Sequence, residues 1–550
     1  MIKAWFKSGS PWVWLNAAAV STSLILVLGL LVLIAVRGLG HFWPANIVEY
    51  HYKDRAGESI VVGEVVDTSL MSAEQAKEAG HEVLNDDEYL EQRLIKIGNR
   101  DLSGMDFRWI QTQYIQQQSY PDDLIAIERR EWGNFYGRLF SVKENDRVIA
   151  EGDKAYEVAQ QKIKKTLAVH DEIEHLQKHE VGAINYGLER LRLKQRSLEL
   201  KGQWNNAAKT QFATQKAEYE KSYQALQQRL GALYQKIRRD SLVASYANGE
   251  TVEIPLEKIV RLIRPNTMSV FDKTLEYVVT FINFVTDEPR EANTEGGIFP
   301  AIFGTVMMVM LMAVIVTPFG VVAAVYLREY ASQGFMTRVI RIAVNNLAGV
   351  PSIVYGVFGL GFFVYILGGN IDQLFYPEAS PAPVFGTPGL MWASLTLALL
   401  TLPVVIVSTE EGLSRIPKSI REGSLALGAT KAETLWRTVL PMASPAMMTG
   451  LILAVARAAG EVAPLMLVGV VKLAPTLPLD GNFPFLHLDR KFMHLGFHIY
   501  DVGFQSPNVE AARPLVYATS LLLVMVIIGL NMFAISIRNH LREKYRALEN

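Results

Sequence analysis

The sequence contains no cysteine, and its 54 Lys and Arg residues are balanced by 55 Asp and Glu residues. Without thiols the chain forms no disulfide, thiolate zinc site or iron–sulfur cluster, and it offers no cysteine nucleophile. A net charge of −1 gives no overall basic field of the kind that draws proteins to nucleic acid. We therefore expect no thiol chemistry and no nucleic-acid partner.

A nucleotide-binding loop is also missing. The pattern G-x-x-x-x-G-K-S/T, whose backbone cradles nucleotide phosphates, does not occur, and no Gly is followed by Lys in any of the 550 residues. The chain therefore has no phosphate-binding loop of this type. No other motif implies a bound cofactor or a metal ion.

Long apolar segments are present instead, and they are unevenly distributed. Residues 14–36 carry no charge, and at about 1.5 Å per residue they are long enough to cross a bilayer. No small-residue cleavage site follows them, so we expect an uncleaved anchor rather than a signal peptide. The indicated fold class is an all-α membrane protein with six transmembrane helices. The other five spans are predicted at residues 299–327, 339–367, 390–408, 445–471 and 515–537.

The distribution of Lys and Arg predicts the orientation of these spans, because cytoplasmic loops carry an excess of both. The loop formed by residues 369–388 has neither. We therefore expect both termini in the cytoplasm, with residues 1–37 forming a tail and the first span, and residues 542–550 a second tail. The basic residues expected on the cytoplasmic side are Lys3, Lys7, Arg328, Arg338, Arg341, Arg415, Lys418, Arg421, Lys431, Arg437, Arg538, Arg542, Lys544 and Arg546.

Residues 38–297 are too polar to lie in a membrane, and this orientation places them outside the cytoplasm. The stretches SIVVGEVVDTSL and DLIAIERREW have strand-like patterns. Residues 151–240 look helical instead. We expect a mixed α/β insert in the periplasm, which serves either as a spacer or as a docking surface for another extracytoplasmic protein.

The helical part of this insert carries a coiled-coil-like pattern, in which apolar and aromatic residues alternate by four and three. A turn near Gly202 would fold it into a long hairpin. His170, His175 and His179 also lie at helical spacings, but no paired acidic or Cys ligands accompany them. We interpret them as solvated helix residues rather than as a metal site. The residues of the seam are Tyr219, Tyr223, Leu226, Leu230, Leu233 and Ile237, with Leu188, Leu191 and Leu198 upstream.

One cytoplasmic connection, residues 410–441, is longer than a chain reversal requires. Its stretch REGSLALGATKAETLWRTVLP resembles the coupling motif of ABC importer permeases, which reads E-A-A, three residues, Gly, nine residues, then I-x-L-P. A plain amphipathic interfacial helix is the alternative interpretation. The matching residues are Glu422, Gly428, Leu440 and Pro441, whereas Gly423 and Ser424 replace the two alanines and Thr438 replaces the Ile.

The resemblance is strongest to the A-type permeases of bacterial phosphate-specific ABC importers, and residues 345–360, 408–430 and 456–467 carry it. It implies a MetI-like, five-helix permease core at residues 298–541 and a transport subunit of the inner membrane that is not itself an enzyme. The implied partners are a cytoplasmic ABC ATPase dimer, a second related permease, a periplasmic phosphate-binding protein and membrane lipid. Two alternatives remain open: an importer of another oxyanion, such as phosphonate or molybdate, and a non-transporting ABC mechanotransmission protein.

Within the predicted fifth span, the stretch LILAVARAAGEVAPLMLVG places Arg457 and Glu461 near the middle of the membrane. A charge there costs roughly 2.5–3.5 kcal/mol even on a mild scale. The two residues are four apart and share one helix face. A guanidinium fork matches phosphate oxygens, so we expect the pair to form a translocation site in which phosphate competes with Glu461 for Arg457. A purely structural ion pair is the alternative.

Proline residues interrupt three of the predicted spans. Pro318 lies in the second span, Pro351 in the third and Pro403 in the fourth, and each frees backbone groups that neighbours must satisfy. They predict either hinges or static bends. Glu410 and Glu411, at the cytoplasmic end of the fourth span, are interpreted as interfacial residues or as part of a gate.

Overall fold

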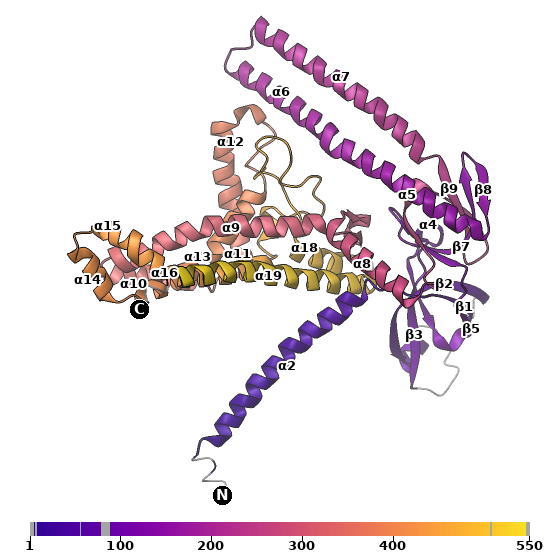
Figure 1. The fold of residues 1–550 in the computed structure, drawn as a ribbon, viewed down its shortest axis with the longest axis horizontal. Coiled ribbons are helices and arrows are strands. Elements are labelled where there is room, and N and C mark those ends of the chain that lie inside the picture. Colours follow the sequence, from indigo (N-terminus) through magenta and orange to yellow (C-terminus); the bar gives the residue numbers. More distant parts are fainter. Residues whose placement is uncertain (1–4, 6–7, 55–56, 79–87, 507–508, 546–550) are drawn as a thin grey trace.

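The computed structural model describes residues 5, 8–54, 57–78, 88–506 and 509–545. Its six candidate membrane spans are Ser10–Gly40, Phe299–Tyr330, Ser352–Phe375, Leu390–Arg415, Lys431–Gly460 and Ala512–Glu543. Figure 1 shows the long helices with a region of strands at one end, from which two further long helices project. The predicted fold class, a six-span helical protein with an additional mixed α/β region, is confirmed. Lys3, Lys7, Arg546 and the side chain of Lys544, used to predict the orientation, lie outside the described residues.

Three of the six spans contain a π-helical segment. The first and last are the helices α2 (Ser10–Gly40) and α19 (Val509–Tyr545), and the fourth is α13 (Leu390–Arg415). The second is α9 (Phe299–Val325) with the π-helical extension Tyr326–Tyr330. The third joins α11 (Ser352–Phe358) to α12 (Gly369–Phe375) through the π-helical segment Gly359–Gly368. The fifth joins α15 (Lys431–Thr434) to α16 (Leu440–Gly460) through the π-helical segment Leu435–Val439.

The third span begins later than the sequence predicted. Residues 335–347 form the separate amphipathic helix α10 (Phe335–Leu347), and α11 starts only after Pro351. Proline disfavours helical backbone in the residue before it, which separates the two helices. Pro351 therefore precedes the helix of the third span, and the prediction that it lies within that span is wrong. Pro318 and Pro403 do lie inside their helices, α9 and α13.

The fifth span is shifted toward the N-terminus relative to the prediction of residues 445–471. The helix ends at Gly460, Glu461 has extended backbone angles, and Pro464 precedes the short helix α17 (Leu465–Val468). Arg457 therefore lies in the last turn of the span and Glu461 just beyond it. The prediction that both charges lie near the middle of one helical span is therefore wrong.

The helix α13 forms the centre of the bundle. Two thirds of its most apolar window, 67%, is buried, and it packs along both α9 and α16. The contact with α16 is so close that a Cβ atom on Gly450 would lie 1.7 Å from Ser408 Oγ and 2.7 Å from Ser408 Cβ. Only glycine fits there without displacing α13. In contrast, α2 packs on α19 and has no buried residue in its apolar window.

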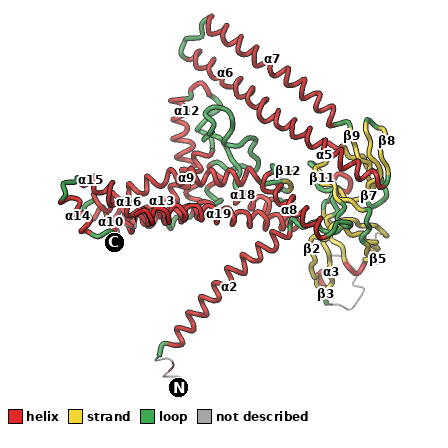
Figure 2. Tube along the Cα trace, in the orientation of Figure 1, coloured by secondary structure: helices red, strands yellow, loops and turns green. Residues whose placement is uncertain are grey.

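The strands β1 to β11 form two antiparallel sheets, and Figure 2 shows them gathered in one region away from the spans. The short strands β12 (Pro289–Arg290) and β13 (Glu295–Gly296) pair with each other before α9. The stretches predicted as strands fall in β2 and β6. Ile47, Val62 and Tyr136 belong to an apolar cluster that joins the sheets. One sheet has the order β4 (Phe107–Gln111), β3 (Tyr89–Lys96), β2 (Gly57–Ser72), β1 (Ile47–Asp54), β5 (Ile115–Ser119). The other has the order β10 (Thr251–Pro255), β9 (Asp240–Ser245), β7 (Phe135–Glu144), β6 (Leu124–Arg129), β11 (Ile259–Ile263), with β8 (Arg147–Glu151) beside β7.

Two long helical segments project from the sheets and return to them (Figure 1). The outgoing segment joins α5 (Asp153–His175) to α6 (Gly182–Leu200) through the π-helical turn Leu176–Val181, and α7 (Asn206–Ile237) returns. Leu226, Leu233 and Ile237 of α7 are buried against residues of the outgoing segment. We call α5, α6 and α7 together the helical hairpin. The remaining short helices are α3 (Ala73–Glu78), α4 (Arg100–Ser103) and α18 (Leu495–Tyr500), and α8 (Val270–Thr286) connects the sheets to α9.

The close contact between α13 and α16 gives a direct test of the packing. We expect Gly450→Val to lower the free energy of unfolding by about 1–3 kcal/mol, because the added atoms overpack the contact with Ser408. Thermal denaturation of the purified protein in detergent measures the change. Gly529→Val on α19 is the matched control, since its Cβ would meet nothing within 4 Å. Equal melting temperatures for the two variants would contradict the packing argument.

Candidate translocation pathway and coupling surface

Arg457 and Glu461 form an ion pair on one face of α16, as their spacing predicted. Arg457 Nε lies 3.5 Å from Glu461 Oε1, and the two side chains are 34% and 20% exposed. Behind them, Ala454, Ala458 and Ala459 are fully buried in the core that α16 shares with α13 and α9. Leu453, one turn before Arg457, is 56% exposed. The face that carries the ion pair is therefore the open face of α16, directed away from the centre of the bundle.

The backbone that follows the ion pair is fixed by the third span. A Cβ on Gly356 of α11 would lie 2.6 Å from Pro464 Cα, so the two segments touch through their backbones. Tyr355, next to Gly356, belongs to the same buried cluster as Ala458 and Leu465. Arg457 and Glu461 therefore lie where the end of one span meets the start of another.

The segment predicted to couple to an ATPase folds into two short helices with a tight turn between them. We call α14 (Lys418–Ala426), α15, the turn that joins them and the π-helical segment Leu435–Val439 together the knob. Gly428 has a φ of +90°, which favours glycine and lets the chain reverse after α14. Thr430 and Glu433 form a capping box at the start of α15. Ser424 Oγ lies 2.9 Å from Thr434 Oγ1, which ties the two helices together.

The surface of the knob carries both polar and large apolar residues. Glu422 and Gly423 are exposed, and Leu427 and Trp436 are 91% and 76% exposed. Leu440 and Pro441 mark the junction between the knob and α16, where Pro441 occupies the first turn of the helix. From Lys431 to Gly460 the chain is helical without interruption, so one rod runs from the knob to Arg457.

Arg421 anchors the knob to the spans, a role that the sequence analysis missed. Its guanidinium donates hydrogen bonds to Glu329 at 2.9 Å, to the Ile416 carbonyl at 2.7 Å and to the Leu413 carbonyl at 2.8 Å. Lys431 adds a hydrogen bond to the Glu329 carbonyl. The ends of α9 and α13 are thus held to the knob. The position of Arg421, directly before the Glu of the coupling motif, was the available signal.

Glu410 and Glu411 differ in their surroundings. Glu410 accepts a hydrogen bond from Arg341 of α10 at 3.2 Å, and Arg341 also donates to the Leu327 carbonyl. Glu411 is exposed. The structure therefore joins Glu410 to the neighbouring helices and leaves Glu411 on the surface.

At the opposite end of the bundle the helical hairpin rests on the loop formed by residues 472–492. Tyr186 of α6 donates a hydrogen bond to the Phe483 carbonyl, and its ring lies edge-on to His487 with 5.9 Å between centroids. Arg190 lies over the Phe483 ring at 5.7 Å. The helix α6 also packs on residues 377–379, just beyond the end of α12. The hairpin is therefore attached to the loops at this end of the bundle as well as to the sheets.

This loop has its own polar network around Asp480. Arg490 and His487 lie 2.7 Å and 2.9 Å from its carboxylate. Burial raises the pKa of Asp480, but hydrogen bonds from the Asn482 backbone, Arg490 and His487 outweigh that effect and hold the pKa at about 2. The carboxylate is therefore ionised at neutral pH and holds the loop in shape for α6.

A second charged pair that the sequence analysis missed lies near this loop. Lys472 Nζ is 3.0 Å from Asp501 Oδ2, and the Asp501 side chain is only 2% exposed. Asn293 donates to the Lys472 carbonyl at 2.7 Å. Burial lowers the pKa of His494 to about 3 and that of His498, close to Asp501, to about 4, so both rings are neutral at pH 7. Lys472 is therefore the cation that balances the buried Asp501.

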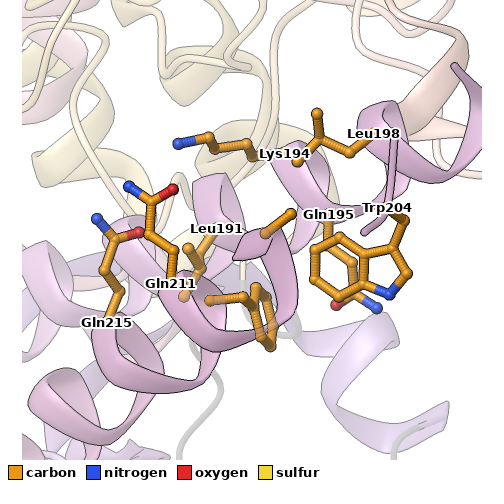
Figure 3. Close-up of a pocket in the computed structure, with 9 residues that line it drawn as sticks. Leu191, Lys194, Gln195, Leu198, Trp204, Gln211 and Gln215 are labelled. Atoms are coloured by element: carbon orange, nitrogen blue, oxygen red, sulfur yellow. The ribbon is translucent and has the colours of Figure 1, made fainter. Parts of the chain in front are cut away.

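The helical hairpin carries two further features. Figure 3 shows a small pocket between α6 and α7 near the tip, lined by Leu191, Lys194, Gln195, Leu198, Trp204, Ala208, Gln211, Phe212 and Gln215. In α5, His170, Asp171 and Glu174 have ligand atoms within 4.8 Å of one another. Lys178 already bonds Glu174 at 2.5 Å, however, and this cation opposes the binding of another. The arrangement fits a metal ion poorly.

Several known proteins are similar to the bundle. Residues 316–547 match the family described as binding-protein-dependent transport system inner membrane component. The phosphate transport system permease protein PstA of Mycobacterium leprae is 35% identical over 267 residues, which are 48% of this chain and 78% of that protein. A probable PstA of Methanocaldococcus jannaschii is 32% identical over 244 residues, 44% of this chain and 74% of that protein. Inward-facing MetNI, a methionine ABC transporter, matches 44% of this chain and 94% of the solved chain, with 18% identity and a TM-score of 0.33.

The buried pair Lys472–Asp501 can be tested by removing its cation. Lys472→Met leaves the Asp501 carboxylate buried without a counter-charge, so we expect the free energy of unfolding to fall by about 3–5 kcal/mol. Thermal denaturation in detergent gives the measurement. Adding Asp501→Asn should restore most of the loss, because it removes the stranded charge.

Lys53→Met is the control, because it breaks an ion pair to Glu58 in which both side chains are more than half exposed. We expect this variant to change the stability by less than about 1 kcal/mol. If Lys472→Met were no more destabilising than Lys53→Met, the pair would not be the balancing interaction inferred here.

Proposed function

Because the chain belongs to the family of PstA-type permeases of ABC importers, we propose that it forms part of a path for inorganic phosphate across the inner membrane. It is a multi-pass transport subunit rather than an enzyme. The observation that carries the proposal is the Arg457–Glu461 pair on the open face of α16. A membrane-embedded face with two charges is costly unless another subunit or a passing ion shares it.

The chemistry of this pair suits hydrogen phosphate. The guanidinium of Arg457 presents parallel N–H groups that match two phosphate oxygens. Glu461 neutralises Arg457 when the site is empty, and it can accept a hydrogen bond from the proton of hydrogen phosphate, which sulfate lacks. The anion displaces Glu461 from Arg457 and is released when the carboxylate returns. This competition keeps binding weak enough for passage.

The two ends of the bundle suggest different partner proteins for this subunit. The knob lies among the basic residues Arg338, Arg415 and Lys418, so we place it in the cytoplasm, where Leu427 and Trp436 contact an ABC ATPase dimer. The opposite end, with the sheets and the helical hairpin, lies in the periplasm and receives phosphate from a binding protein. A second, related permease covers the open face of α16 and completes the pore.

Arg457→Ala should abolish ATP-driven phosphate uptake, because the variant has no cation to hold the anion on its path. Uptake of labelled phosphate into vesicles that contain the complete transporter measures this. Arg192→Ala is the matched control, since Arg192 is a 57% exposed residue of the helical hairpin and lies away from α16. Uptake by Arg457→Ala at the rate of the control would refute the role of the pair.

Uptake and ATP-hydrolysis assays with the same vesicles distinguish the alternative functions. If unlabelled molybdate or a phosphonate competes better than phosphate, the substrate is another oxyanion. If the unaltered complex hydrolyses ATP without accumulating any of these anions, the chain belongs to a machine that moves partners and transports nothing. Saturable phosphate accumulation that requires ATP supports the proposal.

The knob gives an independent prediction. Trp436→Ala should raise the dissociation constant of the ATPase at least about ten-fold, because an exposed Trp at the centre of a contact is typically a major contributor to binding. Binding of the purified ATPase to the permease in detergent measures it. Phe504→Ala, which alters an equally exposed aromatic residue outside the knob, should leave the affinity unchanged. Unchanged binding by Trp436→Ala would remove Trp436 from the proposed contact.

A further inference from the structure

The helix α8, which links the sheets to the second span, has an apolar stripe that nothing in the described part of the chain covers. Phe271, Leu275, Val278 and Ile282 follow one another at intervals of four, three and four residues, so they lie on one side of the helix. Their side chains are 77%, 59%, 46% and 51% exposed. A contiguous apolar surface of this kind marks a binding face rather than a solvated one.

The opposite side of α8 is fixed to the sheets, so the helix cannot rotate to hide the stripe. Arg261 of β11 bonds Glu276 and also donates to Thr280 at 2.6 Å. Lys273 bonds Asn46, just before β1. The capping box of Ser269 and Asp272 fixes the start of the helix. The polar contacts therefore direct the stripe away from the insert.

Two membrane spans end beside α8. Phe42, two residues beyond α2, packs against Phe281 and Phe284 of α8 with ring centroids 5.3 Å and 5.0 Å apart. At the same C-terminal end of α8, the Phe284 carbonyl accepts a hydrogen bond from Ile298, the residue before α9. Since α2 and α9 both reach the membrane surface at these points, the C-terminal end of α8 lies at that surface.

The neighbourhood of α8 also indicates what covers the stripe. The apolar window of α2 has no buried residue, so lipid surrounds it. Trp43, at the end of α2, is 45% exposed and lies 6.2 Å from the Tyr277 ring of α8. Trp and Tyr gather where the bilayer meets water. The stripe thus continues a surface that is already in contact with lipid.

We infer that α8 is an interfacial membrane helix, which inserts Phe271, Leu275, Val278 and Ile282 between the lipid headgroups and the acyl chains of the outer leaflet. The stripe has no Lys or Arg, so binding depends on apolar burial rather than on anionic lipid. Through Arg261 and Lys273 the helix fixes the height of the insert above the membrane. This inference does not depend on which solute is transported.

The absence of cysteine allows a direct test with single-cysteine variants of the full chain in phosphatidylcholine vesicles. Val278→Cys places an environment-sensitive fluorophore such as NBD on the stripe, and Val148→Cys places it on β8. Both valines are exposed to a similar degree, 46% and 48%, and β8 lies on the far side of the insert from α2 (Figure 1). We expect nitroxide-labelled lipid to quench the probe at Val278 several-fold more strongly than the probe at Val148, and aqueous iodide to show the reverse preference.

Three outcomes would overturn the inference. Equal quenching of the two probes by iodide would place the stripe in water. A Val278 probe reached by neither quencher would mean that a protein subunit covers it. Quenching by lipid only after phosphatidylglycerol is added would mean that charge drives the contact. Ile282→Cys, on the same stripe, repeats the test if Val278→Cys does not fold, and Arg457→Ala in the same background should leave the quenching unchanged.

Discussion

The arrangement of the bundle depends on how closely α13 is approached by its neighbours. At Gly450 there is no room for a side chain beside Ser408, and at Gly320 of α9 a Cβ would lie 2.5 Å from the Val405 side chain. Such contacts bring helix backbones together where lipid provides no hydrophobic driving force between helices. They also fix three helices relative to one another. The end of α9 with Glu329, the end of α13 with Glu410 and the start of α16 are therefore held in one register.

Local patterns predicted much of this structure. The six apolar segments and the helical spacing of Arg457 and Glu461 both depend on neighbouring residues, which a sequence displays directly. The third span was misplaced because residues 335–347 are apolar on one face and resemble the start of a span until Pro351 divides them. The fifth was displaced because the apolar character continues past Glu461, where the helix stops.

Other features were hidden because they join distant parts of the chain. Arg421 forms a hydrogen bond with Glu329, which is 92 residues away in the sequence, and Tyr186 forms one with Phe483, which is 297 residues away. No periodicity links such residues, so neither the anchoring of the knob nor the position of the helical hairpin could be derived from the sequence. The stripe on α8 is periodic, but it is short and lies within a polar region, and only the exposure of Phe271 and its neighbours distinguishes it from a buried helix face.

The uninterrupted helix from Lys431 to Gly460 has a mechanical consequence. At 1.5 Å per residue, roughly 40 Å separate Lys431 from Arg457. A rod of that length that pivots by about 5° at one end moves the other end by about 3.5 Å. That movement is comparable to the 3.5 Å between Arg457 and Glu461. A small rotation at the knob is therefore sufficient to open or close a charge contact at the opposite end of the same continuous helix.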